Sequence, residues 1–272
     1  MIGNPVSGLA LAMSCFLAAS PTWAARLEVA PEAPNWMHLG AATLLFLHVG
    51  GGTLGLVAGT AASFTRKGGR RHRFWGRLFV AGMSVTYLVG AAVAPFLDQG
   101  QRPNFVAGVL ALYLLVTGVA AAKRRRFRAG RSEVTGFALA LAITFLGVAF
   151  MVEGAQDPSG TVDGSPPQAF LIFVVAGAAA AIGDWRALRL KTLSNAQRTT
   201  RHLWRMCASF FFASGSLFFG QPQIFPSWFV GSLLQAILAF GPLVIMAGWL
   251  VREARRGAKN SPAAAKVLAD SA

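Results

Sequence analysis

Seven apolar runs, each close to the length that crosses a membrane, constrain this sequence more than any other feature. We place them at 38–64, 76–97, 104–122, 133–152, 167–183, 203–219 and 228–250. About 17–25 apolar residues cross the hydrocarbon core of a bilayer as one α-helix. Strands of membrane barrels instead alternate apolar and polar residues over about ten positions. The sequence therefore predicts an all-α, polytopic membrane helix bundle with about seven transmembrane helices.

Composition supports a membrane protein. Hydrophobic residues make up 54% of the chain and charged residues only 13%, whereas about 25% is usual for soluble domains. No carboxylate falls in the middle of a predicted span. Intramembrane carboxylates are the usual proton or ion carriers of coupled transporters and pumps. We therefore expect neither a proton pump nor an ion-coupled transporter.

Positive charge is concentrated in blocks between the predicted spans. Of the 25 Lys and Arg residues, 23 fall in 66–77, 123–131, 186–205 and 252–266. With seven spans, all four blocks lie on one side, which the positive-inside rule places in the cytoplasm together with the C-terminus. We expect these blocks to touch anionic lipid head groups of the bilayer. No nucleic-acid partner is expected, because no module of groove-binding size accompanies the charge.

The flanking segments suggest how the chain is organised. Residues 1–25 form a signal-like or additional hydrophobic segment, and a retained segment makes eight helices. A third alternative makes Met37 the first residue of the cellular protein. Residues 26–37 are expected to be a linker on the outer side, 38–251 a single helical bundle domain, and 252–272 a disordered cytoplasmic tail.

One histidine lies deep in a predicted span beside a run of small residues. Gly51, Gly55 and Gly59 follow His48 at offsets that place all four residues on one helical face. Such a glycine stripe lets another helix pack closely. The sequence allows two roles for His48: it forms an interhelical hydrogen bond, or it contacts a ligand such as a quinone.

Two further histidines begin helices on the side of the basic blocks. His72 and His202 each have arginines on both sides and a tryptophan nearby. They are either interfacial anchors or, if their helices are adjacent, two axial ligands for one haem b. His38, at the outer surface, is expected to be an interfacial residue. No metal-ion ligand set is predicted.

The span after His202 has two expected faces. Ser209 and Ser216 lie on a small-residue stripe that is expected to pack against other helices. Phenylalanines cover much of the remainder, and we expect that side to face lipid: Phe210, Phe211, Phe212, Phe218 and Phe219.

Two short patterns suggest a family. The first is His72-x3-Gly76-x6-Met83 after a span with a histidine and spaced glycines, and the second is the His202-x2-Arg205-Met206 opening of a later span. The chain resembles, over most of 38–250, a family of bacterial predicted multi-pass membrane proteins described as a domain of unknown function. The resemblance implies an inner-membrane protein and carries no activity or cofactor. It favours His48, His72, His202 and Arg205 over His38 as candidate contacts.

The sequence leaves two classes of function open. The first is a non-enzymatic membrane protein for small-molecule transport, sensing or assembly, in which the histidines fasten helices. The second is a membrane redox protein that binds haem through His72 and His202, or a quinone near His48. An intramembrane zinc hydrolase is disfavoured, because no cluster of several histidines with an aspartate is evident.

Overall fold

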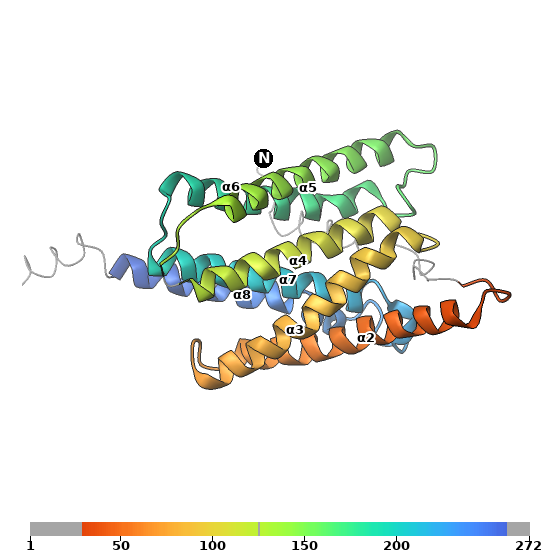
Figure 1. The fold of residues 1–272 in the computed structure, drawn as a ribbon, viewed down its shortest axis with the longest axis horizontal. Coiled ribbons are helices and arrows are strands. Elements are labelled where there is room, and N and C mark those ends of the chain that lie inside the picture. Colours follow the sequence, from red (N-terminus) through yellow and green to blue (C-terminus); the bar gives the residue numbers. More distant parts are fainter. Residues whose placement is uncertain (1–28, 125, 260–272) are drawn as a thin grey trace, which may run out of the picture.

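Every regular element is a helix in the part of the chain that the computed structural model describes, residues 29–124 and 126–259 (Figure 1). The predicted all-α class is therefore confirmed. The predicted N-terminal segment 1–25 lies outside the described residues. The long helices are α2 (Asn35–Phe64), α3 (Arg70–Val93), α4 (Gln101–Lys123), α5 (Arg131–Gln156), α6 (Leu171–Leu190), α7 (Asn195–Phe218) and α8 (Leu233–Lys259); three short 3-10 helices are η1 (Ala94–Phe96), η2 (Pro167–Phe170) and η3 (Pro222–Ile224).

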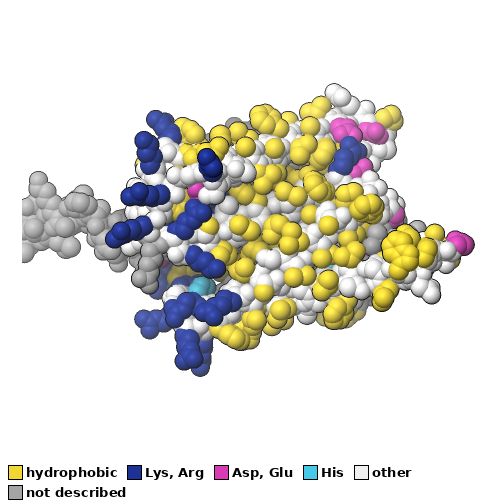
Figure 2. Space-filling model, viewed as in Figure 1, with side chains coloured by type: hydrophobic (Ala, Val, Ile, Leu, Met, Phe, Trp, Pro, Cys, Tyr) yellow, Lys and Arg dark blue, Asp and Glu magenta, His cyan; other side chains and the backbone are white. Residues whose placement is uncertain are grey.

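Six helical segments among the described residues are long and apolar enough to cross a membrane. They comprise α2, α3 with η1, α4, α5, α6 with η2, and the part of α8 up to Glu253. Apolar side chains cover much of the surface between the two ends of the bundle (Figure 2). The chain is thus a multi-pass membrane protein. The seventh predicted span, 203–219, falls in α7, whose first half is too polar to join this group; the number of crossings remains a prediction.

α7 lies in the interior of the bundle, packed against α4 and α8 and touching α2 (Figure 1). α2 pairs with α3, α5 pairs with α6, and α3 also packs on α4. Phe210 and Phe211 are consequently buried, and the ring of Phe210 lies edge-on to Phe79 of α3, with 5.6 Å between ring centres. The prediction that these phenylalanines face lipid is wrong, because neighbouring helices cover several sides of α7.

Three predicted boundaries differ from the structure. α8 begins at Leu233 rather than 228, because Pro226 and Gly231, whose φ is +79°, interrupt the chain before it. α6 continues past 183 to Leu190. α8 continues to Lys259, so the first part of the tail expected to be disordered is helical; its Glu, Ala, Arg and Lys residues all favour helix.

Charge divides between the two ends of the bundle. Lys and Arg side chains gather at one end, with histidine among them, and acidic side chains gather at the other (Figure 2). The α2–α3, α4–α5 and α6–α7 connections and the C-terminal end of α8 lie at the first end, which we call the basic end (Figure 1). We call the opposite end the acidic end.

The glycine stripe of α2 packs directly on α3. A Cβ at Gly51 would lie 2.8 Å from the carbonyl oxygen of Gly82, and one at Gly55 would lie 2.3 Å from the Met83 methyl carbon. The same test at Gly59 places the added carbon 2.8 Å from the Phe79 ring. The two helices therefore pack so closely that a methyl group added at one of these glycines would collide with α3.

The two serines singled out on α7 have different surroundings. Ser209 is fully buried and donates a hydrogen bond to the Ala111 carbonyl of α4 at 3.0 Å. Ser216 is exposed, so the prediction that it packs between helices is wrong. Ser214 is buried instead and donates to the Ala239 carbonyl at 2.9 Å, because α8 covers that face of α7.

An ion-pair clip joins two connections at the acidic end. Arg102, at the start of α4, donates to Asp163 of the α5–α6 loop from Nε at 3.0 Å and from Nη2 at 2.9 Å. The same guanidinium donates to Glu153 at 2.7 Å. The hydrogen bonds from Arg102 lower the pKa of the Asp163 carboxyl. Because the clip is partly exposed, solvent screening limits its contribution to the free energy of unfolding to about 1 kcal/mol or less.

The clip predicts a specific pH dependence. A carboxyl whose pKa is lowered on folding contributes stability above its unfolded pKa of about 4, and that contribution disappears as the pH falls through the folded value. At pH 7 the wild type is expected to be more stable than Asp163→Asn by up to about 1 kcal/mol, with no difference well below pH 4. Thermal unfolding in detergent between pH 7 and pH 3 measures this. Arg102→Gln should remove at least this increment, because it also breaks the pair with Glu153. A pH-independent difference between the wild type and Asp163→Asn would contradict the account.

Candidate functional site

A carboxylate is fully buried inside the bundle. Asp184 of α6 has no exposed surface. It accepts a hydrogen bond from the hydroxyl of Tyr113 on α4. Its other oxygen forms ion pairs with Arg201 and Arg205 of α7, the latter at 2.9 Å from Nη2. Asp184 lies one residue beyond the predicted span 167–183, but α6 continues to Leu190 and takes this carboxylate into the bundle.

Arg205 is held on several sides. Its Nη1 donates to the hydroxyl of Thr117, and its Nη2 lies 3.3 Å from the carbonyl oxygen of Ala180. The guanidinium lies 5.1 Å from the ring centres of both Tyr113 and Trp204. Such cation–π contacts are strongest where water is excluded, and Arg205 is fully buried.

Sequence spacing explains how these groups meet. Arg201 and Arg205 are four residues apart on α7, as are Tyr113 and Thr117 on α4, so each pair shares one helical face. α5 leaves room for the carboxylate because Gly136 has no side chain; a Cβ there would lie 3.1 Å from its Oδ2. We call Asp184, Tyr113, Thr117, Arg201 and Arg205 the Asp184 cluster.

The Asp184 cluster carries more positive than negative charge. One carboxylate faces two guanidinium groups, which leaves a net charge of +1. Arg201 Nε and Arg205 Nε are also buried without a hydrogen-bond partner among the described residues. Burial of paired charges is costly, and removing one partner costs more because it leaves the other uncompensated. The cluster therefore acts as an ionic clamp between α4, α6 and α7.

Sequence reasoning identified Arg205 but missed its partners. The predicted span ended at 183, one residue before Asp184. The available signal was an aspartate at the end of an apolar run, followed on the next helix by two arginines four residues apart. Opposite charges with that spacing on consecutive helices indicate a buried ion pair. Tyr113 gave no comparable signal, because an isolated tyrosine in an apolar helix is common.

The two histidines at the basic end are each fastened to a different helix. His72, in the first turn of α3, has Nδ1 3.1 Å from the Ala62 carbonyl oxygen of α2. His202, in the second turn of α7, has Nδ1 3.0 Å from the Gly118 carbonyl oxygen of α4. A carbonyl oxygen only accepts, so Nδ1 carries the hydrogen in each neutral ring. Nε2 then keeps its lone pair, which is the arrangement of a metal-binding imidazole.

Both histidines lie at the basic end of the bundle, His72 in the first turn of α3 and His202 in the second turn of α7. Lys67 lies in the α2–α3 connection, where it donates to the carbonyl oxygens of Ala62 and Ser63 at 3.1 and 2.6 Å. α3 and α7 touch two turns further along, where the ring of Phe79 lies edge-on to that of Phe210. Sequence alone could not show this contact, because a long stretch of chain separates the two helices.

His48 occupies a different place. Its Nδ1 lies 3.0 Å from the Thr86 carbonyl oxygen, and the Thr86 hydroxyl donates to the His48 carbonyl at 3.1 Å. A Cβ at Gly90 would lie 3.1 Å from the imidazole ring. His48 is thus part of the tightly packed α2–α3 interface, away from the basic end. His38 is exposed near the start of α2.

No group of three or more His, Cys, Asp or Glu side chains converges on a metal position in the residues that the structure describes. A zinc ion requires three or four protein ligands, whereas haem iron already has four porphyrin nitrogens and needs at most two. The two-histidine donor set at the basic end therefore suits haem better than a bare metal ion.

Comparisons with known proteins add no assignment. No protein-family model, no curated protein and no solved structure matches this chain.

Proposed function

We propose that this chain is a multi-pass protein of the bacterial inner membrane that binds haem b through His72 and His202. It acts in transport, sensing or assembly rather than as an enzyme. One observation carries the proposal: His72 and His202 both lie near the basic ends of their helices, and each donates its Nδ1 hydrogen to a carbonyl of a neighbouring helix. Both rings are thereby oriented, with Nε2 left for the iron.

The charge of the basic end supports the same ligand. The four basic blocks hold 23 of the 25 Lys and Arg residues, and haem carries two anionic propionates. A field of positive charge raises the local concentration of such an anion. The positive-inside rule orients this end toward the cytoplasm, where the haem would be exchanged or sensed. Bound haem supplies one-electron chemistry, which also makes electron transfer available.

A binding role fits the surroundings of Asp184 better than a catalytic role. Its carboxylate is engaged by a tyrosine and two arginines. A carboxylate whose two oxygens are both held by fixed partners is poorly placed to take a proton from a substrate, and it fastens the helices that carry those partners. The Asp184 cluster then fixes the position of α7, and with it His202, relative to α4.

The absorption spectrum of the purified protein tests the proposal. Protein expressed with ample haem is expected to show a Soret band, and dithionite is expected to sharpen the α-band as in low-spin haem with two nitrogen ligands. His72→Ala and His202→Ala should each abolish this spectrum. His48→Ala is the matched control, because it also removes an Nδ1 hydrogen bond between helices yet should leave the spectrum unchanged.

The competing hypothesis is that His72 and His202 only form hydrogen bonds between helices. In that case the wild type shows no visible absorption at full haem supply, and the three alanine variants differ only in thermal stability. An unchanged spectrum in both His72→Ala and His202→Ala would also reject the proposed ligands.

A further inference from the structure

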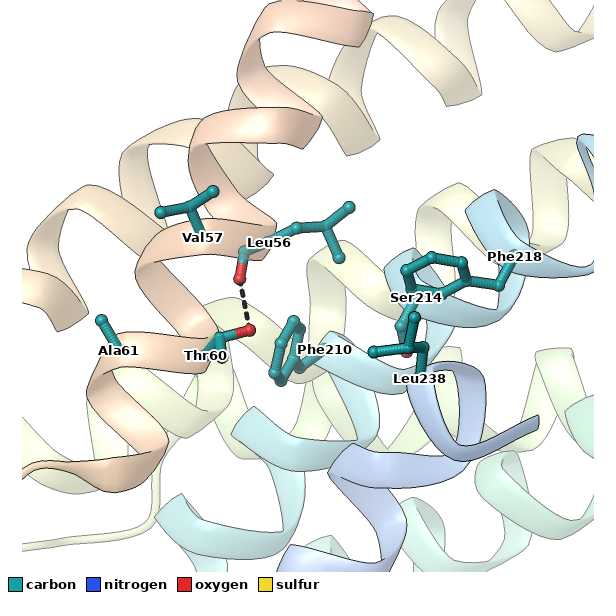
Figure 3. Close-up of a pocket in the computed structure, with 8 residues that line it drawn as sticks. All are labelled: Leu56, Val57, Thr60, Ala61, Phe210, Ser214, Phe218 and Leu238. Carbon is teal, nitrogen blue, oxygen red and sulfur yellow. Dashed lines mark hydrogen bonds between the residues drawn. The ribbon is translucent and has the colours of Figure 1, made fainter. Parts of the chain in front are cut away.

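An apolar groove lies between α2 and α8, with α7 as its floor (Figure 3). It encloses about 440 Å³. Its wall on α2 is formed by Leu56, Val57, Thr60 and Ala61, its floor by Phe210, Ser214 and Phe218, and its other wall includes Leu238.

The polar atoms in this groove are already bonded within the protein. The Thr60 hydroxyl donates to the Leu56 carbonyl at 2.8 Å (Figure 3). The Ser214 hydroxyl donates to the Ala239 carbonyl at 2.9 Å. The groove therefore offers dispersion contacts and no free hydrogen-bond donor. Val57 is 58% exposed and Leu238 41% exposed, so the walls open onto the lipid-facing surface. A hydrocarbon chain fits these properties, and a polar solute does not.

Two cations lie next to the groove at the basic end. Lys67 caps the end of α2 just beyond Ala61, and its Nζ lies 5.0 Å from the ring centre of Trp249 on α8. Arg252 lies 4.8 Å from the same ring. The Lys67–Trp249–Arg252 group thus bridges the end of α2 and α8 at the basic end.

We infer that the groove binds an anionic phospholipid, with one acyl chain between α2 and α8 and its phosphate at Lys67 and Arg252. The charge and the shape agree: an apolar groove opens to lipid, and beyond it toward the basic end two cations lie beside a tryptophan, where head groups meet a membrane protein. The lipid site uses different residues from the histidine pair, so it stands or falls independently of haem binding.

Lipid retention measured by mass spectrometry tests this inference. The full chain is reconstituted in nanodiscs of phosphatidylcholine and phosphatidylglycerol, extracted in mild detergent and analysed intact for bound lipid. The wild type is expected to retain phosphatidylglycerol over phosphatidylcholine. Lys67→Gln keeps a donor for the end of α2 but removes the charge, and should lower that preference about fivefold. Arg71→Gln, at an exposed position in the first turn of α3 beside the same connection, is the control and should retain it.

A second pair of variants tests the groove itself. Val57→Trp fills it and should abolish retention of both lipids, whereas Leu45→Trp adds the same bulk elsewhere on α2 and should not. Circular dichroism and thermal unfolding report whether each variant is folded. Equal retention of the two lipids by the wild type overturns the inference, as does equal behaviour of Lys67→Gln and Arg71→Gln. Displacement of the lipid by inorganic phosphate would show an ion site instead.

Discussion

Asp184→Asn is expected to destabilise the protein by about 3–5 kcal/mol, the usual cost of removing one partner from a buried ion pair. The substitution keeps the size of the side chain and its contact with Tyr113. It removes the only negative charge of the Asp184 cluster, so two buried guanidinium groups repel each other without compensation. For a domain of this size, each kcal/mol lowers the thermal midpoint by about 2–4 °C.

Thermal unfolding in detergent, followed by circular dichroism, measures this loss. Asp163→Asn is the matched control, because it neutralises an aspartate in the partly exposed Arg102 clip and should cost about 1 kcal/mol or less. Similar midpoints for the two variants would mean that the Asp184 cluster contributes no more than a surface ion pair.

The net charge of the Asp184 cluster makes a second comparison informative. Arg201→Gln leaves one carboxylate facing one arginine, a balanced pair. It should therefore cost less than Asp184→Asn, although it removes an ion pair from the same site. In the double variant the two losses should not add, because the groups share partners. An Arg201→Gln loss larger than the Asp184→Asn loss would contradict the assigned charge balance.

Much of the fold followed from hydrophobic length alone. Continuous apolar runs of membrane-spanning length can form little besides helices, because a bilayer offers no partner for unpaired backbone groups. The errors fell where tertiary contacts override local pattern. α7 looked like a span with one aromatic side in lipid, yet α8 and α4 cover it, and Ser214 packs where Ser216 was expected. Periodicity gives the faces of a helix but not their neighbours.

The candidate site was predictable in its parts and not in its assembly. His72 and His202 were identified from their places at helix starts, and the Gly51, Gly55 and Gly59 stripe from its spacing. Which carbonyl each imidazole meets depends on helix packing, which no local pattern encodes. Asp184 was missed for a physical reason: a charge at the end of an apolar run usually marks the membrane surface, whereas this charge is stabilised inside by arginines from the next helix.

Gly82→Ala is expected to destabilise the α2–α3 pair by about 1–3 kcal/mol, as overpacking does in a filled interface. The added methyl carbon would lie 2.5 Å from the Gly51 carbonyl oxygen and 2.9 Å from the Gly55 nitrogen. Both are backbone atoms, so no side-chain rotation relieves the contact and the helices must separate. That separation also stretches the His48–Thr86 bonds, which lie on the same interface.

Gly50→Ala makes the decisive control, because it adds the same methyl group to the facing helix in open space, with no atom within 4 Å. There the substitution acts only through helix propensity, which favours Ala over Gly by up to about 1 kcal/mol. Thermal unfolding of the two variants should therefore give shifts of opposite sign. Equal shifts would mean that helix propensity alone decides the effect of both substitutions, and that α2 moves away from α3 at little cost.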